Sequence, residues 1–165
     1  MKRTIEIDGK EITFKATART PLLYKQWVGR DLFIDIQHIQ TDKESALDVL
    51  GDLAYVMAKQ ADPSIGDIDE WFDQFGMFSI YMALPQLQDM WSAEMSSSVE
   101  SKKKGTRTER ELTTALFLLR CYQNNIPMSD LDALDVGFVF DMFTESANDS
   151  YEYDIVATQE DFDRF

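Results

Sequence analysis

The chain opens with two short runs in which polar and apolar side chains alternate. These runs, 4–7 and 11–15, flank Asp8-Gly9, a dipeptide typical of the tight turn of a β-hairpin. Alternation brings every second side chain to one face of a strand, which here collects Ile5, Ile7, Ile12 and Phe14. Because an isolated hairpin is only marginally stable in water, we expect this face to pack against the helices that follow.

Apolar residues then recur at helical spacing. Thr20-Pro21 predicts the start of a helix over 21–28, since Thr can cap free amides and Pro at the first helical position loses no hydrogen bond. A second helix is predicted over 31–40. The capping-box pattern Thr41-x-x-Glu44 predicts a third, with an apolar face formed by Leu47, Leu50, Leu53, Ala54 and Met57.

Two further apolar segments complete the N-terminal part. Residues 67–75 predict a short helix with Ile68, Trp71, Phe72 and Phe75 on one side. Residues 77–95 predict another helical segment, in which Pro85 is expected to cause a kink or a break. We therefore expect one helical domain over 1–95.

The composition changes at residue 96. Residues 96–107 contain four serines and Lys102-Lys103-Lys104-Gly105, with almost nothing apolar to bury, and predict a flexible linker. Beyond it, Thr108-x-x-Glu111 predicts the start of a helix whose apolar face is Leu112, Ala115, Leu116, Leu119 and Tyr122.

The C-terminal extension is expected to span 108–165. Ser129 is the predicted cap of a second helix there, roughly over 130–145, and residues 146–165 form an acidic, aromatic tail without periodicity. The predicted fold class is mainly α, with an N-terminal β-hairpin, a helical domain, a linker, and a small helical C-terminal module with an acidic tail.

Charge narrows the set of partners. The chain has 16 Lys and Arg against 30 Asp and Glu, a net charge of −14, so nucleic acid and anionic membranes are poor candidates. No signal-peptide pattern opens the chain, and the single cysteine, Cys121, forms no internal disulfide. These features favour a cytoplasmic protein.

Catalytic and metal-binding motifs are scarce. His38 is the only histidine and Cys121 the only cysteine, which are too few ligands for a zinc site. Any catalytic Ser-His or Cys-His pair would have to include His38, and no companion motif accompanies it. Asp130-x-Asp132 matches the start of a calcium-binding loop pattern, but Leu134 stands where that pattern requires an oxygen ligand. We expect a non-enzymatic protein without cofactor or metal. A hydrolase using paired carboxylates is the least favoured alternative.

Two aromatic clusters are candidate binding residues. The first comprises Trp71, Phe72, Phe75, Phe78, Tyr81 and Met82. These residues form either part of the buried core or a groove that receives an apolar helix. The second is the motif at the end of the tail, with Phe162, Arg164 and Phe165, which is either a docking peptide or local packing.

Several stretches of the sequence resemble one known family. They are Thr4-Ile5-Glu6-Ile7-Asp8-Gly9-Lys10, Thr17-Ala18-Arg19-Thr20-Pro21, Gly29-Arg30-Asp31-Leu32, Met57-Ala58-Lys59-Gln60-Ala61-Asp62-Pro63, Asp69-Glu70-Trp71 and Ala157-Thr158-Gln159-Glu160-Asp161-Phe162-Asp163-Arg164-Phe165. Together they resemble the tail assembly chaperones of siphophages and prophages of Gram-positive hosts. The ending is similar to that of the longer, frameshifted product of this family, and three consecutive lysines are compatible with a slippery codon run.

The resemblance implies a function. In that family the N-terminal domain keeps the tape measure protein soluble, and the extension recruits the major tail (tube) protein. It implies location in the host cell cytoplasm and absence from the mature virion. Because release requires reversible binding, we expect many weak sites and self-association of several copies along this client. The alternative is a structural head-tail or tail-completion protein that is retained in the virion.

Overall fold

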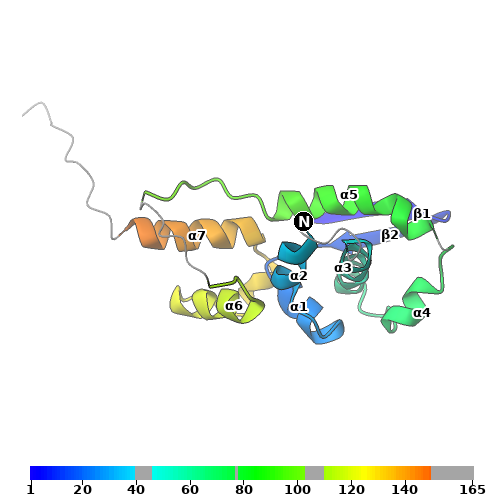
Figure 1. Cartoon of the computed structure of the whole chain (residues 1–165), viewed down its shortest axis with the longest axis horizontal. Helices are drawn as coiled ribbons and strands as arrows, with labels where there is room; N and C mark the ends of the chain where they lie inside the picture. The colour runs from blue at the N-terminus through cyan, green and yellow to red at the C-terminus, as the bar shows by residue number, and fades with distance from the viewer. Residues whose placement is uncertain (40–45, 77, 103–109, 150–165) are drawn as a thin grey trace, which may run out of the picture.

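The computed structural model describes residues 1–39, 46–76, 78–102 and 110–149. It confirms a mainly helical fold that begins with a β-hairpin (Figure 1). The elements, in chain order, are β1 (Lys2–Ile7), β2 (Lys10–Lys15), α1 (Thr20–Trp27), α2 (Leu32–Ile39), α3 (Ala46–Ala61), α4 (Ile68–Phe72), α5 (Ser79–Glu94), α6 (Thr114–Gln123), the 3₁₀ turn η1 (Asp130–Asp132) and α7 (Val136–Asn148).

The hairpin forms as predicted. Ile5 lies opposite Ile12 in the antiparallel ladder, and the turn residues Asp8 and Gly9 have φ angles of +52° and +74°. Positive φ at both positions is the geometry that favours Asp-Gly, since it matches the twist of the two strands. The apolar face packs on α3 and α5, where Ile7 and Phe14 are buried.

Helix α3 lies at the centre of the N-terminal part and contacts β2, α1 and α5. Its predicted apolar face is largely buried, with Leu53, Ala54 and Met57 in the core. Leu47, at the start of the helix, is half-exposed instead. The capping box predicted at Thr41-x-x-Glu44 lies outside the described residues.

Helix α4 is shorter than predicted, and Asp67 caps it by accepting a hydrogen bond from the Glu70 amide at 2.9 Å. Of the kink or break expected at Pro85, the break is wrong, because α5 runs from Ser79 to Glu94 with Pro85 inside it. Proline removes the amide that would bond the Tyr81 carbonyl. Both residues lie on the exposed face of α5, where water can replace the lost donor.

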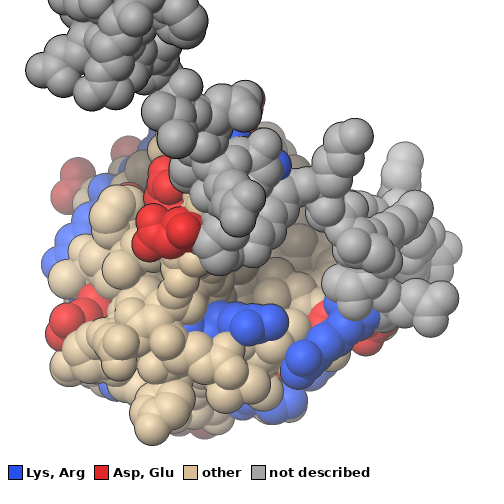
Figure 2. Space-filling view, turned by 90° about the vertical axis from the view of Figure 1, so that its left-hand side faces the viewer, with Lys and Arg blue, Asp and Glu red and all other residues tan. Residues whose placement is uncertain are grey.

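The predicted start and face of α6 are also wrong. The helix begins after Thr113, whose hydroxyl accepts from the Leu116 amide at 3.1 Å, rather than at Thr108-x-x-Glu111. Its buried side carries Phe117 and Cys121, whereas Ala115, Leu119 and Tyr122 are exposed. Figure 2 views the molecule from the end where α6 and α7 lie, and uncharged residues make up much of the surface there that is not grey.

The cause lies in contacts between distant parts of the chain. Asp31, just before α2, accepts hydrogen bonds from the backbone amide and hydroxyl of Thr114, each at 3.1 Å. The Phe117 ring lies 5.4 Å from Phe33 of α2 and 5.6 Å from Phe140 of α7. The start of α6 and its buried face are therefore set by α2 and α7.

The helix predicted over 130–145 is instead the short turn η1 followed by α7. Between them, the Leu134 carbonyl accepts from the Ala18 amide at 2.7 Å. In η1, Asp132 pairs with Lys15 at 2.6 Å and accepts from the Gln60 amide at 3.1 Å. These contacts dock the turn against the end of β2 and α3, which a continuous helix would not allow.

Residues 96–102, the first part of the predicted linker, run along α7 (Figure 1). The Asp141 carboxylate accepts from the Ser97 and Ser98 hydroxyls and from the Ser98 and Val99 amides, at 2.5 to 3.1 Å. The Ser97 bond is the main reason that the pKa of Asp141 falls to about 2. We call residues 96–102 the strap.

One hydrophobic cluster extends through the hairpin, α1 to α5, α6 and α7. Phe33, Phe117 and Val139 belong to it, so the parts before and after the strap are packed against each other. The division into domains at 1–95 and 108–165 stays a prediction, and residues 103–107 of the expected linker lie outside the described residues.

Candidate functional site

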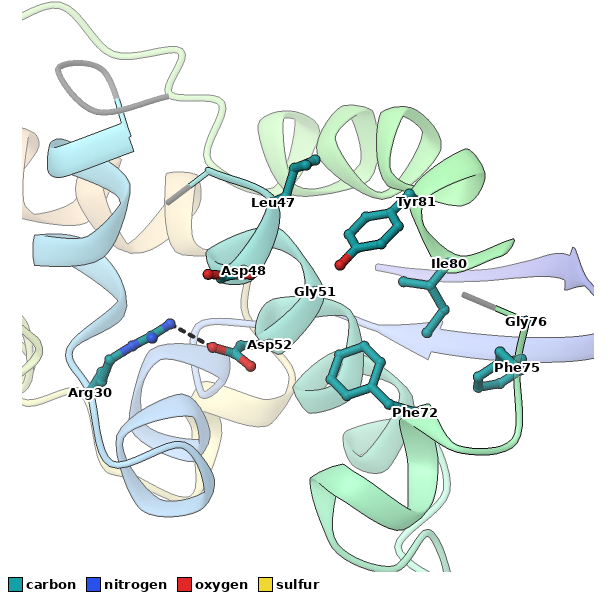
Figure 3. A pocket seen from close by; sticks show the side chains of 10 residues that line it. All are labelled: Arg30, Leu47, Asp48, Gly51, Asp52, Phe72, Phe75, Gly76, Ile80 and Tyr81. Atoms are coloured by element: carbon teal, nitrogen blue, oxygen red, sulfur yellow. Dashed lines mark hydrogen bonds and ion pairs between the residues drawn. The ribbon is translucent and has the colours of Figure 1, made fainter. Parts of the chain in front are cut away.

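A groove of about 490 Å³ opens between α3, α4 and α5 (Figure 3). Helix α3 forms one wall, α5 another, and α4 with the loop that follows it supplies two aromatic rings. Its lining consists of Arg30, Leu47, Asp48, Gly51, Asp52, Phe72, Phe75, Gly76, Ile80 and Tyr81. Three of these, Phe72, Phe75 and Tyr81, are predicted candidate residues.

Trp71 supports the groove from beneath. Its ring packs edge-on against Phe72 at 5.1 Å and Phe75 at 5.2 Å, and lies 5.8 Å from Tyr55 of α3. Only 1% of Trp71 is exposed, so of its two interpretations the structure supports the core. Trp71 thus positions the two phenylalanines rather than offering a surface of its own.

Gly51 keeps the middle of the groove open. A Cβ atom at this position would lie 3.3 Å from the Cζ atom of Phe72, a tighter approach than side chains normally make. The absence of a side chain on this turn of α3 therefore leaves space between the acidic residues on one side and the aromatic residues on the other (Figure 3).

One end of the groove is acidic. Arg30 pairs with Asp52 at 2.5 Å and with Asp35 at 2.8 Å, and it also donates to the Tyr24 hydroxyl at 2.8 Å. Burial is the main cause that raises the pKa of Asp52, against the opposing effect of Arg30. Asp48 is exposed and forms no ion pair with any residue that the structure describes.

The hairpin turn holds the other end in place. The Asp8 carboxylate accepts from the Gly76 amide at 2.6 Å and from the Ser79 hydroxyl, and the bond from Ser79 is the main cause that lowers the Asp8 pKa. Lys10 donates to the Gln74 carbonyl at 3.2 Å and its ammonium lies 5.6 Å from the Phe75 ring centre. The turn thereby fixes the aromatic loop between α4 and α5.

The remaining candidates lie beside the groove. Phe78 is 72% exposed and Met82 is 79% exposed, and together with Tyr81, at 41%, they follow helical spacing along the outer side of α5. Met82 also lines a second hollow of about 340 Å³ between α5 and the hairpin. We call Phe78, Tyr81 and Met82 the α5 stripe.

Sequence reasoning missed part of the lining. Leu47 was predicted as a core residue, whereas Arg30, Asp48 and Asp52 carry no motif that singles them out among so many charged residues. Ile80 lies in a segment that is apolar on nearly every side, so its sequence does not indicate which residues line the groove. The second cluster of candidates, Phe162, Arg164 and Phe165, lies outside the described residues.

The residues considered for catalysis are dispersed. His38 is exposed on α2, and Cys121 is buried in α6, where burial raises the pKa of its thiol to about 11. The described part of the chain contains no group of three His, Cys, Asp or Glu side chains placed to hold a metal ion. Within residues 1–39, 46–76, 78–102 and 110–149, no helix combines the length and apolarity needed to cross a bilayer.

Comparison with models of protein families, with curated proteins and with solved structures found no match. The geometry of the groove and the α5 stripe is therefore the basis for a functional proposal. What it offers chemically is a receptor of mixed polarity, with fixed aromatic rings at one end and carboxylates at the other.

Proposed function

We propose that this chain is a tail assembly chaperone that binds apolar helices of a phage tape measure protein in the groove and on the α5 stripe. The observation that carries the proposal is the exposure of Phe78, Tyr81 and Met82 at helical spacing, beside a groove floored by Phe72 and Phe75. Large apolar side chains left together on a surface commonly mark a site for a protein partner.

The groove is large enough for the anchor side chains of a helix. Its volume of about 490 Å³ lies within the roughly 300–1,000 Å³ that is usual for small-molecule sites, so it holds a few side chains rather than a whole segment. Recognition of a helix by a few anchor side chains in an apolar groove is a common mode of peptide binding. Methionine, as in Met82, adapts its shape to varied partners.

Weak, repeated binding fits the rest of the molecule. The net charge of −14 would keep an apolar client in solution by mutual repulsion between neighbouring complexes. A client with many apolar helices would carry several copies of the chain, which agrees with the self-association along the client that reversible binding favours. Binding through shallow sites also permits release as the tail tube forms.

The second half of the proposal concerns the tail. We propose that Phe162, Arg164 and Phe165 recruit the major tail (tube) protein, that the chain acts without catalysis in the host cell cytoplasm, and that it is absent from the virion. The support for these points is the resemblance of the C-terminal sequence to the long form of the family. Detection of the chain in purified virions would favour the structural alternative.

Co-expression with the tape measure protein encoded beside this chain tests client binding. We expect the wild-type chain to keep the client soluble and to co-purify with it, and the double variant Tyr81→Ser, Met82→Ser to lose it while remaining folded. Leu119→Ser with Tyr122→Ser is the matched control, because these residues are exposed apolar groups on α6. Loss of the client in both variants, or in neither, would contradict the groove as its site.

A truncation after Asp149 tests recruitment of the tube protein. It preserves every contact that the structure describes, whereas a truncation at Ser101 would remove Phe117 and expose Phe33. We expect the truncated chain to retain the tape measure protein and to lose the tail tube protein. If both chains capture the tube protein equally, the tail is not the recruiting segment.

A further inference from the structure

We propose that the groove selects an apolar helix that carries a lysine or arginine close to the side chain it buries. This inference rests on the proposed function for the existence of such a client, and adds the chemistry by which the client is recognised. It follows from the unequal ends of the groove, which is aromatic toward Phe75 and acidic toward Asp48 (Figure 3).

The acidic end has more negative than positive charge. Arg30 is shared by Asp35 and Asp52, so one cation faces two carboxylates, and Asp48 adds a third without an ion pair among the described residues. Asp48 is close enough to Asp52 to contribute to raising its pKa. A single positive charge on a ligand would reduce this excess of two negative charges.

Covering this end with a purely apolar ligand would be unfavourable. The Asp52 side chain is already only 17% exposed, and an apolar ligand would remove water from Asp48 without replacing its hydrogen bonds. A lysine or arginine supplies those bonds and keeps the carboxylates ionised. The groove thus disfavours helices that are apolar on all sides, which gives it more specificity than nonspecific hydrophobic binding would.

The acidic residues of the groove lie close to its aromatic floor. Leu47, Asp48, Gly51 and Asp52 lie on one side of α3, with the acids flanking the open position at Gly51. A ligand side chain that contacts Phe72 therefore lies next to Gly51, whose neighbours Asp48 and Asp52 can accept hydrogen bonds from a basic side chain of the same ligand.

Two other occupants are less favoured by charge. The tail of this chain, residues 150–165, contains five Asp and Glu residues against Arg164 alone, and would add negative charge to the acidic end. A second copy of the chain brings a further net charge of −14. A basic, apolar helix of another protein is the occupant that the groove complements.

Fluorescence anisotropy with the full chain and labelled synthetic peptides tests this selection. The probe is a short amphipathic helix with a leucine face and one lysine a turn from its central leucine, and the matched peptide has glutamate in place of that lysine. At low ionic strength we expect the lysine peptide to bind about tenfold more tightly, and the difference to shrink in about 0.5 M salt.

Asp48→Asn removes the unpaired carboxylate without breaking the Arg30 ion pairs, and Asp89→Asn, at an exposed position of α5, is its control. We expect Asp48→Asn to reduce the preference for lysine to about threefold or less, and Asp89→Asn to leave it unchanged. An unchanged preference in Asp48→Asn would overturn the assignment of the acidic end.

Other outcomes separate this inference from the proposed function. Equal binding of the two peptides would overturn charge selection while leaving the groove as a receptor for apolar helices. Failure of both peptides to bind would overturn the groove as a client site altogether. A peptide with the sequence of residues 150–165 that binds more tightly than the lysine peptide would assign the groove to the chain's own tail.

Discussion

Trp71 and Phe78 are seven residues apart and similar in chemistry, yet they have opposite roles. Trp71 is enclosed by Tyr55, Phe72 and Phe75, whereas Phe78 stands in solvent just before α5. Burial of an aromatic side chain stabilises the fold, and an exposed one contributes little until a partner covers it. Substitutions at the two positions should therefore separate stability from binding.

We expect Trp71→Ala to lower the free energy of unfolding by about 3–5 kcal/mol, the usual range for removing a large buried aromatic side chain. Phe78→Ala should change it by less than about 0.5 kcal/mol, as is typical of exposed sites. Urea unfolding, monitored by far-ultraviolet circular dichroism, measures both free energies of unfolding. A Trp71→Ala variant with wild-type stability would show that this ring does not support the groove.

Glu94 provides a test by pH. Its side chain is buried against the Met1 amino group, whose nitrogen lies 3.1 Å from the Glu94 Oε2 atom, and burial raises the pKa of Glu94 from 4.5 to about 7. The folded chain therefore binds more protons than the unfolded chain between these values. Stability from this group is present below about pH 4.5 and is lost as the pH rises through about 7.

Glu94→Gln should remove this dependence. Between about pH 5 and pH 8 we expect the wild-type chain to lose up to about 3 kcal/mol more unfolding free energy than the variant. Denaturant titrations at several pH values measure the difference. Parallel pH profiles for the two chains would show that the Glu94 carboxyl is not protonated preferentially in the folded state.

At the scale of single residues, the sequence identified the apolar candidates but did not show which of them are buried and which are exposed. Spacing places Trp71, Phe72 and Phe75 on one side of a helix, and only the three-dimensional contacts decide which ring is covered. The acidic lining could not be predicted, because Asp48 and Asp52 become neighbours of Phe72 through the packing of α3 on α4. Nothing local distinguishes them from other acids.

At the scale of elements, short sequence motifs predicted turns and helix starts correctly where local backbone preferences determine them. The Asp8-Gly9 turn and the position of Pro21 in the first turn of α1 depend on backbone preferences that are readable in sequence. The prediction that Thr20 caps this helix is wrong, because Thr20 lies inside it and its hydroxyl accepts from the Thr17 amide and donates to Gln60 instead. The errors occur where a distant contact decides. Asp31 fixes the start of α6, and the docking of Asp132 on Lys15 interrupts the helix predicted over 130–145.

The strap on α7 was missed because it has little apolar surface. Its contacts are polar and repeat along one side of the helix, at Gly137, Asp141 and Asn148. A Cβ atom at Gly137 would lie 1.8 Å from the Ser96 carbonyl oxygen, and the Asn148 side chain bonds the backbone of Glu100 and Lys102. A stretch rich in serine is thus held in place mainly by hydrogen bonds, with close packing against Gly137.

Gly137→Ala should displace the strap. We expect faster hydrogen exchange at the Ser98 and Val99 amides, which are bonded to Asp141, and a loss of about 1–3 kcal/mol in unfolding free energy from the steric conflict. Ser146→Ala, on the exposed side of α7, is the control. Unchanged exchange at Ser98 and Val99 in Gly137→Ala would contradict this packing.

At the scale of the whole molecule, α3, α4 and α5 build the groove with support from the hairpin, while α6 and α7 pack against α2 and the strap lies on α7. Phe33, Phe117 and Phe140 join these parts in one core. A client bound at α3 and α5 would leave the end of the molecule near α7 free. That arrangement permits one chain to contact two partners at once, as the proposed adaptor role requires.

Hydrogen exchange across the whole chain, with and without the tape measure protein, tests the central claim most directly. We predict that the client slows exchange in residues 46–52 and 71–86, around the groove and the α5 stripe, and leaves α6 and α7 unchanged. Slower exchange confined to α6 and α7, or no difference along the chain, would contradict the assignment of the groove as the client site.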